Sequence, residues 1–188
     1  MIVNMKVFIA GPRAITALDE QVKARLDNVM KNEMTVLVGD ANGVDRTIQN
    51  YLHSAQHNAV LVYASGGKPR NNAANWPIVA VNAGKSRGFD FYAAKDLQMA
   101  IDADYGFMIW NGISKGTLNN IINLTRLGKK SLVYFTPQKE FICVDSYDKL
   151  NELVHTCDNA TIRLYESLMR QEKRSPESEQ MALNVMNG

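Results

Sequence analysis

The sequence predicts an α/β fold: a Rossmann-like three-layer sandwich with a mostly parallel sheet, helices on both faces and extra C-terminal helices. First, short apolar runs alternate with amphipathic segments, which is typical of βα units and a parallel sheet. Second, glycine, asparagine or aspartate follows most of these runs, where turns from strand to helix are expected. Third, 188 residues with 46% hydrophobic and 21% charged residues are typical of one globular domain.

The first third of the chain contains three apolar runs separated by two helical patterns. The runs are short and rich in β-branched residues, as expected for buried strands. In the first helical pattern, Leu18, Val22 and Leu26 share one face, and Thr16 is the expected N-cap. The expected strands are 6–10, 35–38 and 59–63, and the expected helices are 16–30 and 44–55.

Residues 64–90 interrupt this alternation. Their first part is rich in Gly, Pro and Asn, and their last part is basic and flanked by glycine. Between these parts, 76–81 fits either a short strand or an extended loop. A segment of this length in a compact domain is usually functional or disordered, and we favour a function. Its cations are candidate phosphate ligands: Lys68, Arg70, Lys85 and Arg87.

The alternation resumes after residue 90. The expected elements are a helix over 91–101, a strand over 105–110, a helix that stops near 128, strands over 130–135 and 141–144, and two late helices. From about residue 171 the chain turns polar. We therefore predict a single Rossmann-like nucleotide-ligand domain over residues 1–170 and a flexible tail over residues 171–188.

Composition and charge narrow the functional classes. The 21 Lys and Arg residues against 19 Asp and Glu give a net charge of +2, which disfavours binding to nucleic acid through clustered cations. No apolar run reaches the roughly 20 residues of a membrane span, and residues 1–6 lack the pattern of a signal peptide. The cysteines, Cys143 and Cys157, match no zinc motif. We expect a cytoplasmic protein with no membrane partner, no metal and no cofactor.

Four loops are expected at the carboxyl edge of the sheet, where open parallel sheets bind ligands. Glycine lets the backbone approach a ligand, and helix N-termini offer N–H groups to anions, so we expect a small phosphorylated ligand. Neither GxxxxGKS/T nor GxGxxG occurs, which argues against a P-loop NTPase or an ordinary NAD dehydrogenase. The candidate ligand-binding residues are Gly11, Pro12, Arg13, Gly39, Asp40, Gly43, Arg87, Trp110, Asn111, Ser114, Lys115, Gly116 and Thr117.

Residues 36–45 resemble the strand–glycine–aspartate–helix element of the YspA/YpsA-like SLOG proteins. Residues 103–117 are similar to the same superfamily's element of aspartate, apolar strand, loop and S-x-G-T. The superfamily includes the LOG and Smf/DprA proteins, so the resemblance implies a Rossmann-like fold that binds nucleotides or their derivatives. It also implies a homodimer or higher homo-oligomer. The chain departs from the family pattern at Lys95-Asp96, where an Arg-Asn pair is usual.

The same region is also similar to nucleoside 2-deoxyribosyltransferases, whose first strand runs into Ala-Gly-Pro as residues 9–12 do here. These enzymes and the LOG phosphoribohydrolases carry a glutamate three residues after the threonine, where this chain has Asn120. Cleavage of an N-glycosidic bond needs a carboxylate to attack or stabilise the sugar, and asparagine does neither. We predict that the glutamate mechanism is absent. If chemistry occurs, the catalytic candidates are Asp45, Asp104 and Asn120.

The sequence therefore favours binding of a nucleotide or nucleotide-derived small molecule, with ADP-ribose and NAD types among the candidates, at the carboxyl edge of the sheet. The alternative is an N-glycosidic bond-cleaving enzyme of phosphoribohydrolase or deoxyribosyltransferase type that uses an aspartate. A third hypothesis, DprA-like binding of nucleic acid, is disfavoured by the net charge of +2. Trp110 fits either stacking on a base or burial in the core, and Asp45 fits either catalysis or a first-turn helix acid.

Overall fold

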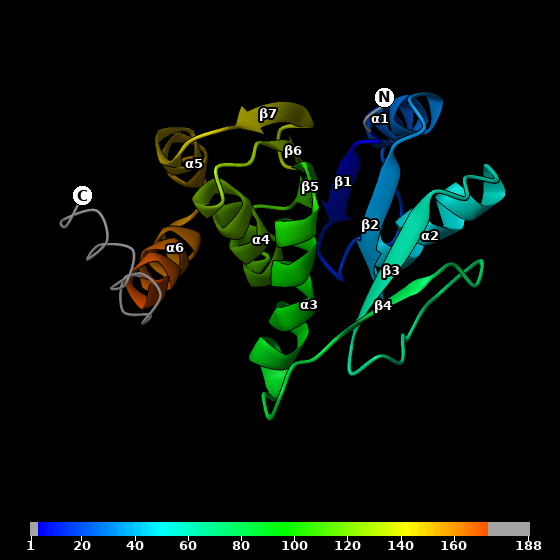
Figure 1. The fold of residues 1–188 in the computed structure, drawn as a ribbon. Coiled ribbons are helices and arrows are strands. Elements are labelled where there is room, and N and C mark those ends of the chain that lie inside the picture. The colour runs from blue at the N-terminus through cyan, green and yellow to red at the C-terminus, as the bar shows by residue number, and fades with distance from the viewer. Residues whose placement is uncertain (1–3, 173–188) are drawn as a thin grey trace, which may run out of the picture.

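The computed structural model describes residues 4–172 and confirms the predicted three-layer α/β fold (Figure 1). A seven-stranded sheet forms the middle layer, in the order β4-β3-β2-β1-β5-β6-β7. All neighbouring strands are parallel except β6 and β7, which are antiparallel. The strands are β1 (Lys6–Ala10), β2 (Thr35–Gly39), β3 (Val60–Ser65), β4 (Ile78–Val81), β5 (Tyr105–Trp110), β6 (Ser131–Phe135) and β7 (Glu140–Val144).

The centre of the sheet is the point at which the direction of chain progress reverses. From β1 the chain adds β2, β3 and β4 on one side, and from β5 it adds β6 and β7 on the other. Ile9 pairs with Val38 on one side and with Phe107 on the other, so β1 and β5 are direct neighbours. The loops that follow β1 and β5 therefore lead away in opposite directions, which is the arrangement that opens a binding crevice at the carboxyl ends.

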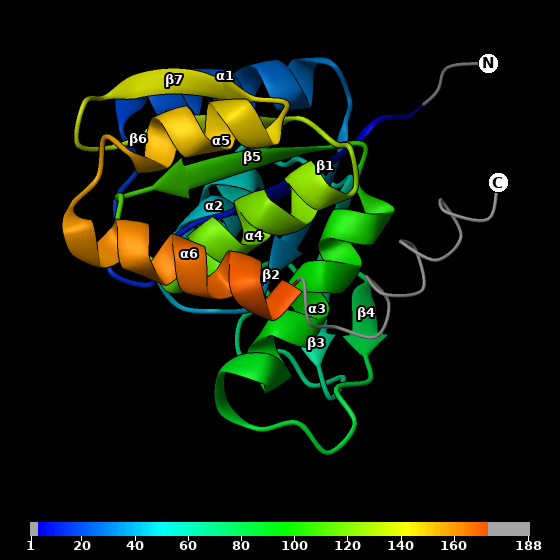
Figure 2. The ribbon, with the colours of Figure 1, turned by 90° about the vertical axis from the view of Figure 1, so that its left-hand side faces the viewer.

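Helices cover both faces of the sheet, and each face has its own apolar core (Figures 1 and 2). Successive residues of a strand point to opposite faces, so Val7 and Ile9 join one core and Phe8 and Ala10 join the other. One face carries α1 (Glu20–Lys31) and α2 (Val44–Ser54); the other carries α3 (Gly88–Asp102), α4 (Lys115–Arg126), α5 (Tyr147–Val154) and α6 (Asn159–Glu172).

The structure corrects two expected helix starts. The first helix begins at Glu20 and not after Thr16, because the Asp19 carboxylate accepts a hydrogen bond from the backbone N–H of Gln21 at 3.1 Å. Helix α3 begins at Gly88. Residues 78–81 form the edge strand β4, so the interruption between β3 and α3 contains a strand of the sheet.

The expected C-terminal tail and the expected absence of a membrane span can be compared with the structure only for the residues that it describes. Apart from residues 171 and 172 at the end of α6, the expected tail over 171–188 lies outside the described residues. Within residues 4–172, none of the helices is long and apolar enough to cross a membrane.

Candidate functional site

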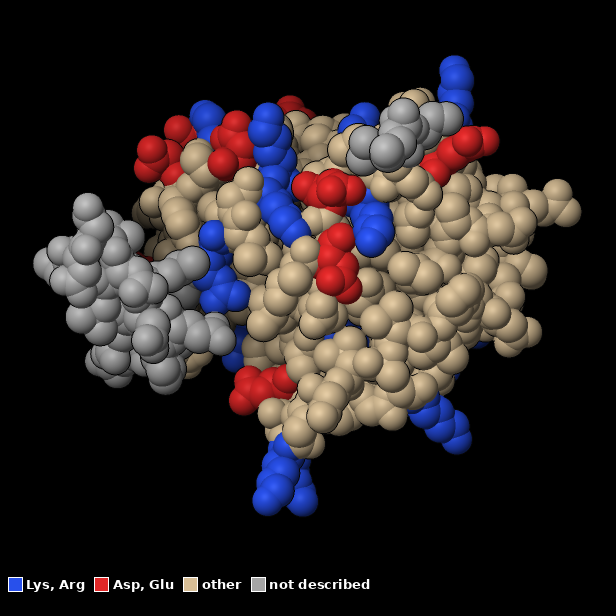
Figure 3. All heavy atoms as spheres, in the orientation of Figure 1, with Lys and Arg blue, Asp and Glu red and all other residues tan. Residues whose placement is uncertain are grey.

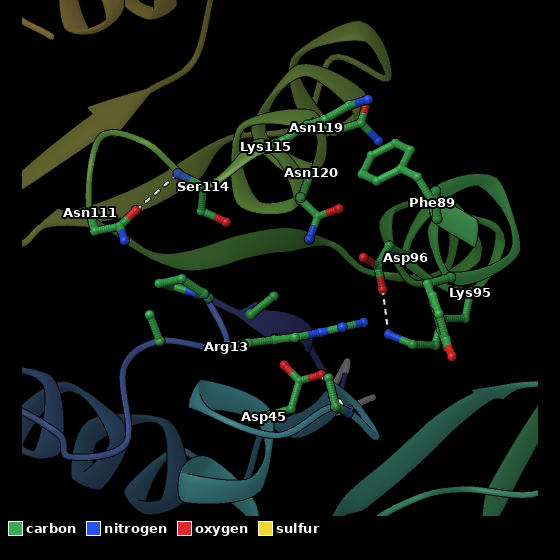
Figure 4. Close-up of a pocket in the computed structure, with 18 of the residues that line it drawn as sticks. Arg13, Asp45, Phe89, Lys95, Asp96, Asn111, Ser114, Lys115, Asn119 and Asn120 are labelled. Carbon is green, nitrogen blue, oxygen red and sulfur yellow. Dashed lines mark hydrogen bonds and ion pairs between the residues drawn. The ribbon is translucent and has the colours of Figure 1, made fainter. Parts of the chain in front are cut away.

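A cleft of about 590 Å³ opens at the carboxyl ends of β1 and β5. Its walls are the loop after β1, the loop and first turns that lead into α4, and the amino-terminal half of α3 (Figure 4). Arg13 and Asp45 lie on one side, and Asn111, Ser114 and Asn120 lie on the other. The polar and aromatic residues that line it are Arg13, Asp45, Arg70, Phe89, Tyr92, Lys95, Asp96, Asn111, Ser114, Lys115, Asn119 and Asn120.

The start of α4 forms one wall of the cleft. Ser114 is the N-cap, and its hydroxyl accepts hydrogen bonds from the backbone N–H of Thr117 at 3.4 Å and from the Thr117 hydroxyl at 3.1 Å. The Asn111 carboxamide accepts the backbone N–H of Ser114 at 3.0 Å and holds the loop in place. The backbone N–H groups of Lys115 and Gly116 have no acceptor within the helix, because they belong to its first turn. This wall therefore presents the positive end of a helix to the cleft.

Trp110 supports this wall from within the core. Its side chain is fully buried, and its ring lies 5.7 Å from the Phe135 ring, centroid to centroid. Its indole N–H donates to the carbonyl of Ser114 at 3.2 Å. Trp110 therefore holds the N-cap residue in position and presents no ring face to a ligand.

Arg13 reaches the cleft from the loop after β1, and that loop packs against the start of α2. The amide of Val44 donates to the carbonyl of Pro12 at 3.2 Å. Gly43 has a φ of +79°, and a Cβ at this position would collide with the backbone of Arg13. Glycine is thus required twice here, for its left-handed conformation and for the close approach of two loops. The side chain of Arg13 lies over the Tyr92 ring, 5.2 Å from its centroid.

The floor of the cleft is a buried group of charges at the carboxyl end of β2. Lys95, from the middle of α3, donates to the Asp96 carboxylate at 2.6 Å and lies 4.0 Å from the Asp40 carboxylate. The Asp45 carboxylate accepts the backbone N–H of Ala41 at 3.1 Å. A Cβ at Gly39 would collide with the Asp45 carboxylate and lie 2.6 Å from Lys95 Nζ, so glycine lets both side chains keep their present positions.

Burial and charge act in opposite directions on these groups. Burial raises the pKa of Asp45 to about 6, although attraction to Lys95 opposes the rise. Burial also favours the neutral amine of Lys95, but the neighbouring carboxylates Asp96, Asp45 and Asp40 outweigh it and raise the pKa of Lys95 above its ordinary value. Lys95 is therefore a fixed positive charge, and Asp45 is a carboxyl group that changes its protonation state near pH 6.

Asp40 anchors the segment between β3 and α3 and does not line the cleft. Its buried carboxylate accepts three hydrogen bonds from Arg70: from the backbone N–H at 2.9 Å, from Nε at 3.0 Å and from Nη2 at 2.8 Å. Burial alone would raise the pKa of Asp40, but the Arg70 hydrogen bonds outweigh burial and hold it below the ordinary value. Gln49 adds to the anchor by accepting the backbone N–H of Ala73 at 3.0 Å.

Exposed apolar side chains form the rim of the cleft. Phe89 and Tyr92 come from the first turns of α3 and are 38% and 36% exposed, and Ile113 comes from the loop before α4. Lys115 Nζ lies 4.1 Å from the centroid of the Phe89 ring. Aromatic rings and cations are thus paired at the rim.

Asn120 lies in the cleft wall one helical turn after Gly116. Its side chain is buried, with 3% of the residue exposed, and its Oδ1 has no hydrogen-bond partner among residues 4–172. Most buried polar atoms have such a partner, so an unpaired acceptor in the wall of a cleft is exceptional.

The structure brings most of the expected site residues together. The expected residues that line the cleft are Gly11, Pro12, Arg13, Asp45, Asn111, Ser114, Lys115, Gly116 and Asn120. Others support the cleft from behind without lining it: Gly39, Asp40, Gly43, Trp110 and Thr117.

Two expected residues lie elsewhere. Arg87 is exposed at the N-cap position of α3 and does not line the cleft. Asp104 precedes β5 and accepts the backbone N–H of Lys6 at 2.7 Å, at the amino ends of β5 and β1. A residue just before a parallel strand lies at the amino edge of the sheet, opposite the cleft, and the sequence already contained this signal.

The sequence reasoning assigned no site role to four residues of α3. Phe89, Tyr92, Lys95 and Asp96 all line the cleft. A charged pair in the middle of a largely apolar helix was the available signal, since charges on a helix packed against a sheet need partners.

Among known proteins, the chain is similar to a solved structure in its fold. No family model and no curated protein matches the chain. A solved structure of DNA processing protein A from Helicobacter pylori matches with a TM-score of 0.57 and 16% sequence identity, over 89% of this chain and 81% of that chain. At this identity the likeness shows that the two chains share a fold.

The same comparison corrects the expectation that nucleic acid is disfavoured as a partner. The Helicobacter pylori protein binds single-stranded DNA, so a protein with this fold has such a partner, and the expectation drawn from the net charge is wrong. Figure 3 shows basic and acidic side chains interspersed over the face it depicts. Net charge is an average over the whole surface, and a few cations at one cleft are enough to contact phosphates.

Proposed function

We propose that the cleft binds a nucleotide or a nucleotide-derived small molecule, with its phosphate at the start of α4. The observation that carries the proposal is that the N-terminus of α4, Arg13 and Lys115 line the same cleft as two exposed aromatic rings. The resemblance to YspA/YpsA-like SLOG proteins, drawn from residues 36–45 and 103–117, supports the same ligand class.

The phosphate end of this proposal rests on the first turn of α4. The N–H groups of Lys115 and Gly116 are available to an acceptor, and a Cβ at Gly116 would meet no atom within 4 Å, so a ligand approaches the backbone freely. Arg13 and Lys115 supply the positive charge. Charged hydrogen bonds of this kind contribute about 1.5–3 kcal/mol each.

The base end rests on Phe89 and Tyr92. In the structure the cationic groups of Lys115 and Arg13 lie over these two rings. A phosphate attracts both cations more strongly than a ring does, and the movement of Lys115 toward it leaves the Phe89 ring face open to a base. The Tyr92 ring also carries the Arg70 guanidinium, 4.4 Å from its centroid, so Phe89 is the ring that becomes free. Stacking on an aromatic side chain contributes about 1–3 kcal/mol per base.

Calorimetric titration with AMP, ADP-ribose and NAD tests this proposal. The Arg13→Ala variant is expected to bind at least about tenfold more weakly, since 1.4 kcal/mol corresponds to a factor of ten. Lys130→Ala is the matched control, because Lys130 is an exposed cation before β6 and outside the cleft. Equal affinity of the wild type and the Arg13 variant, or no binding of any of the three, would contradict the proposal.

Single-stranded DNA is a second candidate ligand, favoured by the shared fold with a protein that binds it. Rings and cations at the rim of the cleft also suit a single strand, which is bound by stacking and by charge. Fluorescence anisotropy with a labelled oligothymidylate separates the two candidates. If the oligonucleotide binds in a salt-dependent way through Arg13 and free nucleotides do not bind, the strand is the ligand.

Cleavage of an N-glycosidic bond is favoured by one further observation. Asp45 and Asp96 both line the cleft, and the pKa of Asp45 is raised to about 6, which suits a general acid. Chromatography of nucleoside monophosphates incubated with the protein would show release of the free base. Loss of release in Asp45→Asn, with binding retained, would support catalysis; no release by the wild type would leave binding as the function.

A further inference from the structure

We propose that Asn120, together with Asp96, recognises the ribose hydroxyls of the ligand and makes the cleft selective for ribonucleotides over 2′-deoxyribonucleotides. This inference rests on the proposed binding of nucleotides. It adds the part of the ligand that distinguishes RNA-type from DNA-type nucleotides.

The unpaired oxygen of Asn120 is the first step. Asn120 Oδ1 is buried and has no partner in the described part of the chain, although the side chain lines the cleft. An unsatisfied buried acceptor is costly to keep, and a hydrogen-bond donor supplied by a ligand would satisfy it. The missing group is therefore a donor, such as a hydroxyl or an amine.

Asp96 places a carboxylate in the same cleft. It lies on α3, which packs against α4, and its Oδ1 accepts the Lys95 ammonium at 2.6 Å. The hydrogen bond from Lys95 orients the Asp96 carboxylate. Two acceptors from neighbouring helices suit a pair of adjacent hydroxyls, each of which donates one hydrogen bond.

The position of Asn120 along α4 indicates that its hydrogen-bond donor belongs to the sugar of the ligand and not to the base. Asn120 lies four residues after Gly116, which is about 6 Å along the helix axis. The phosphate is assigned to the N–H groups at Gly116 and the base to the rings at the rim. The donor that reaches Asn120 from a phosphate held at Gly116 is thus on the sugar.

The test compares AMP, GMP, CMP and UMP with their 2′-deoxy counterparts by calorimetry. The wild type is expected to prefer at least one ribonucleotide tenfold or more over its deoxy form. Asn120→Leu, which is close in shape and has no polar atom, is expected to lose the preference. Asn120→Asp retains an acceptor and is expected to keep the preference, even if the added negative charge weakens all nucleotides.

A second readout separates recognition from folding. Asn120→Leu is expected to melt no lower than the wild type, because it removes an unpaired polar atom from a buried site. Asn123→Leu, on the same helix and outside the cleft, is the matched control and is expected to keep the ribose preference.

The outcomes distinguish this inference from the proposed function. Equal binding of ribo and deoxy forms by the wild type overturns the sugar-recognition role and leaves nucleotide binding intact. A preference that survives Asn120→Leu also overturns it. Failure of every nucleotide to bind overturns both proposals.

Discussion

Replacing Asp45 with asparagine is expected to change the pH dependence of stability in a defined direction. Asp45 is 5% exposed, and burial raises its pKa from the ordinary 3.8 to about 6 in spite of the nearby Lys95. Between these two pH values the folded protein holds a proton at Asp45 that the unfolded chain has lost. The contribution of Asp45 to stability therefore falls as the pH rises through this window.

The size of the effect follows from the same pKa. A pKa that rises from 3.8 to about 6 corresponds to about 3 kcal/mol, at 1.36 kcal/mol per pKa unit. Asparagine has a similar shape and never ionises. Part of this change falls below pH 4.5, so the Asp45→Asn variant should gain about 2 kcal/mol relative to the wild type between pH 4.5 and pH 7.5, whatever its offset at low pH.

Urea unfolding followed by tryptophan fluorescence, at several pH values between 4.5 and 7.5 and at constant ionic strength, measures this difference. Asp158→Asn is the control without a pH dependence in this range, because the backbone N–H of Thr161 donates to Asp158 at 2.7 Å and lowers its pKa below the ordinary 3.8. Asp158 stabilises the fold fully above its ordinary pKa of 3.8 and loses this effect only as the pH falls below it, so the difference between its variant and the wild type should stay constant over this pH range.

The reasoning would be refuted by a difference between Asp45→Asn and the wild type that stays constant with pH. An increase in the free energy of unfolding of the wild type relative to the variant as the pH rises would refute it more strongly. Such a result would mean that the attraction of Lys95 exceeds the cost of burying the Asp45 carboxylate, with a folded-state pKa below 3.8.

Three further changes test the parts that position the cleft. Gly43→Ala should destabilise the protein by more than about 1–2 kcal/mol in urea unfolding, since it adds left-handed strain to a collision with the Arg13 backbone; an unchanged midpoint would contradict this. Asp40→Asn removes the charge that holds Arg70 and should speed proteolytic cleavage within residues 64–87. Equal digestion rates of the variant and the wild type would contradict this. Trp110→Phe removes the indole N–H bond to the α4 cap and should cost about 0.5–1.5 kcal/mol plus the lost packing, with weaker phosphate binding; unaltered affinity would show that this support is dispensable.

Much of the fold is visible in the sequence because it depends on local patterns. Apolar runs of strand length predict β1, β2, β3, β5 and β6, and the loops after β1, β2 and β5 carry glycine where chain segments approach closely. The predicted start of α1 was less accurate, because Asp19 and not Thr16 caps the helix. Several polar residues near a helix start can each serve as the N-cap.

The candidate site was harder to predict, because its residues gather from distant parts of the chain. Asn111 and Ser114 were found since they sit in a loop at the carboxyl edge. Lys95 and Asp96 were assigned no site role, because a helical pattern does not say which turn of a helix faces the end of a neighbouring strand. Only the packing of α3 against the sheet decides that.

By itself, the sequence determined the fold class, the carboxyl-edge loops and the absence of a glutamate at position 120, since each follows from residue order and short-range periodicity. Tertiary structure alone decided that Trp110 is a core support, that Asp104 lies at the opposite edge, and that Asn120 Oδ1 lacks a partner among the described residues. The reason is physical: burial and hydrogen-bond pairing depend on which elements pack together, and no single segment contains that information.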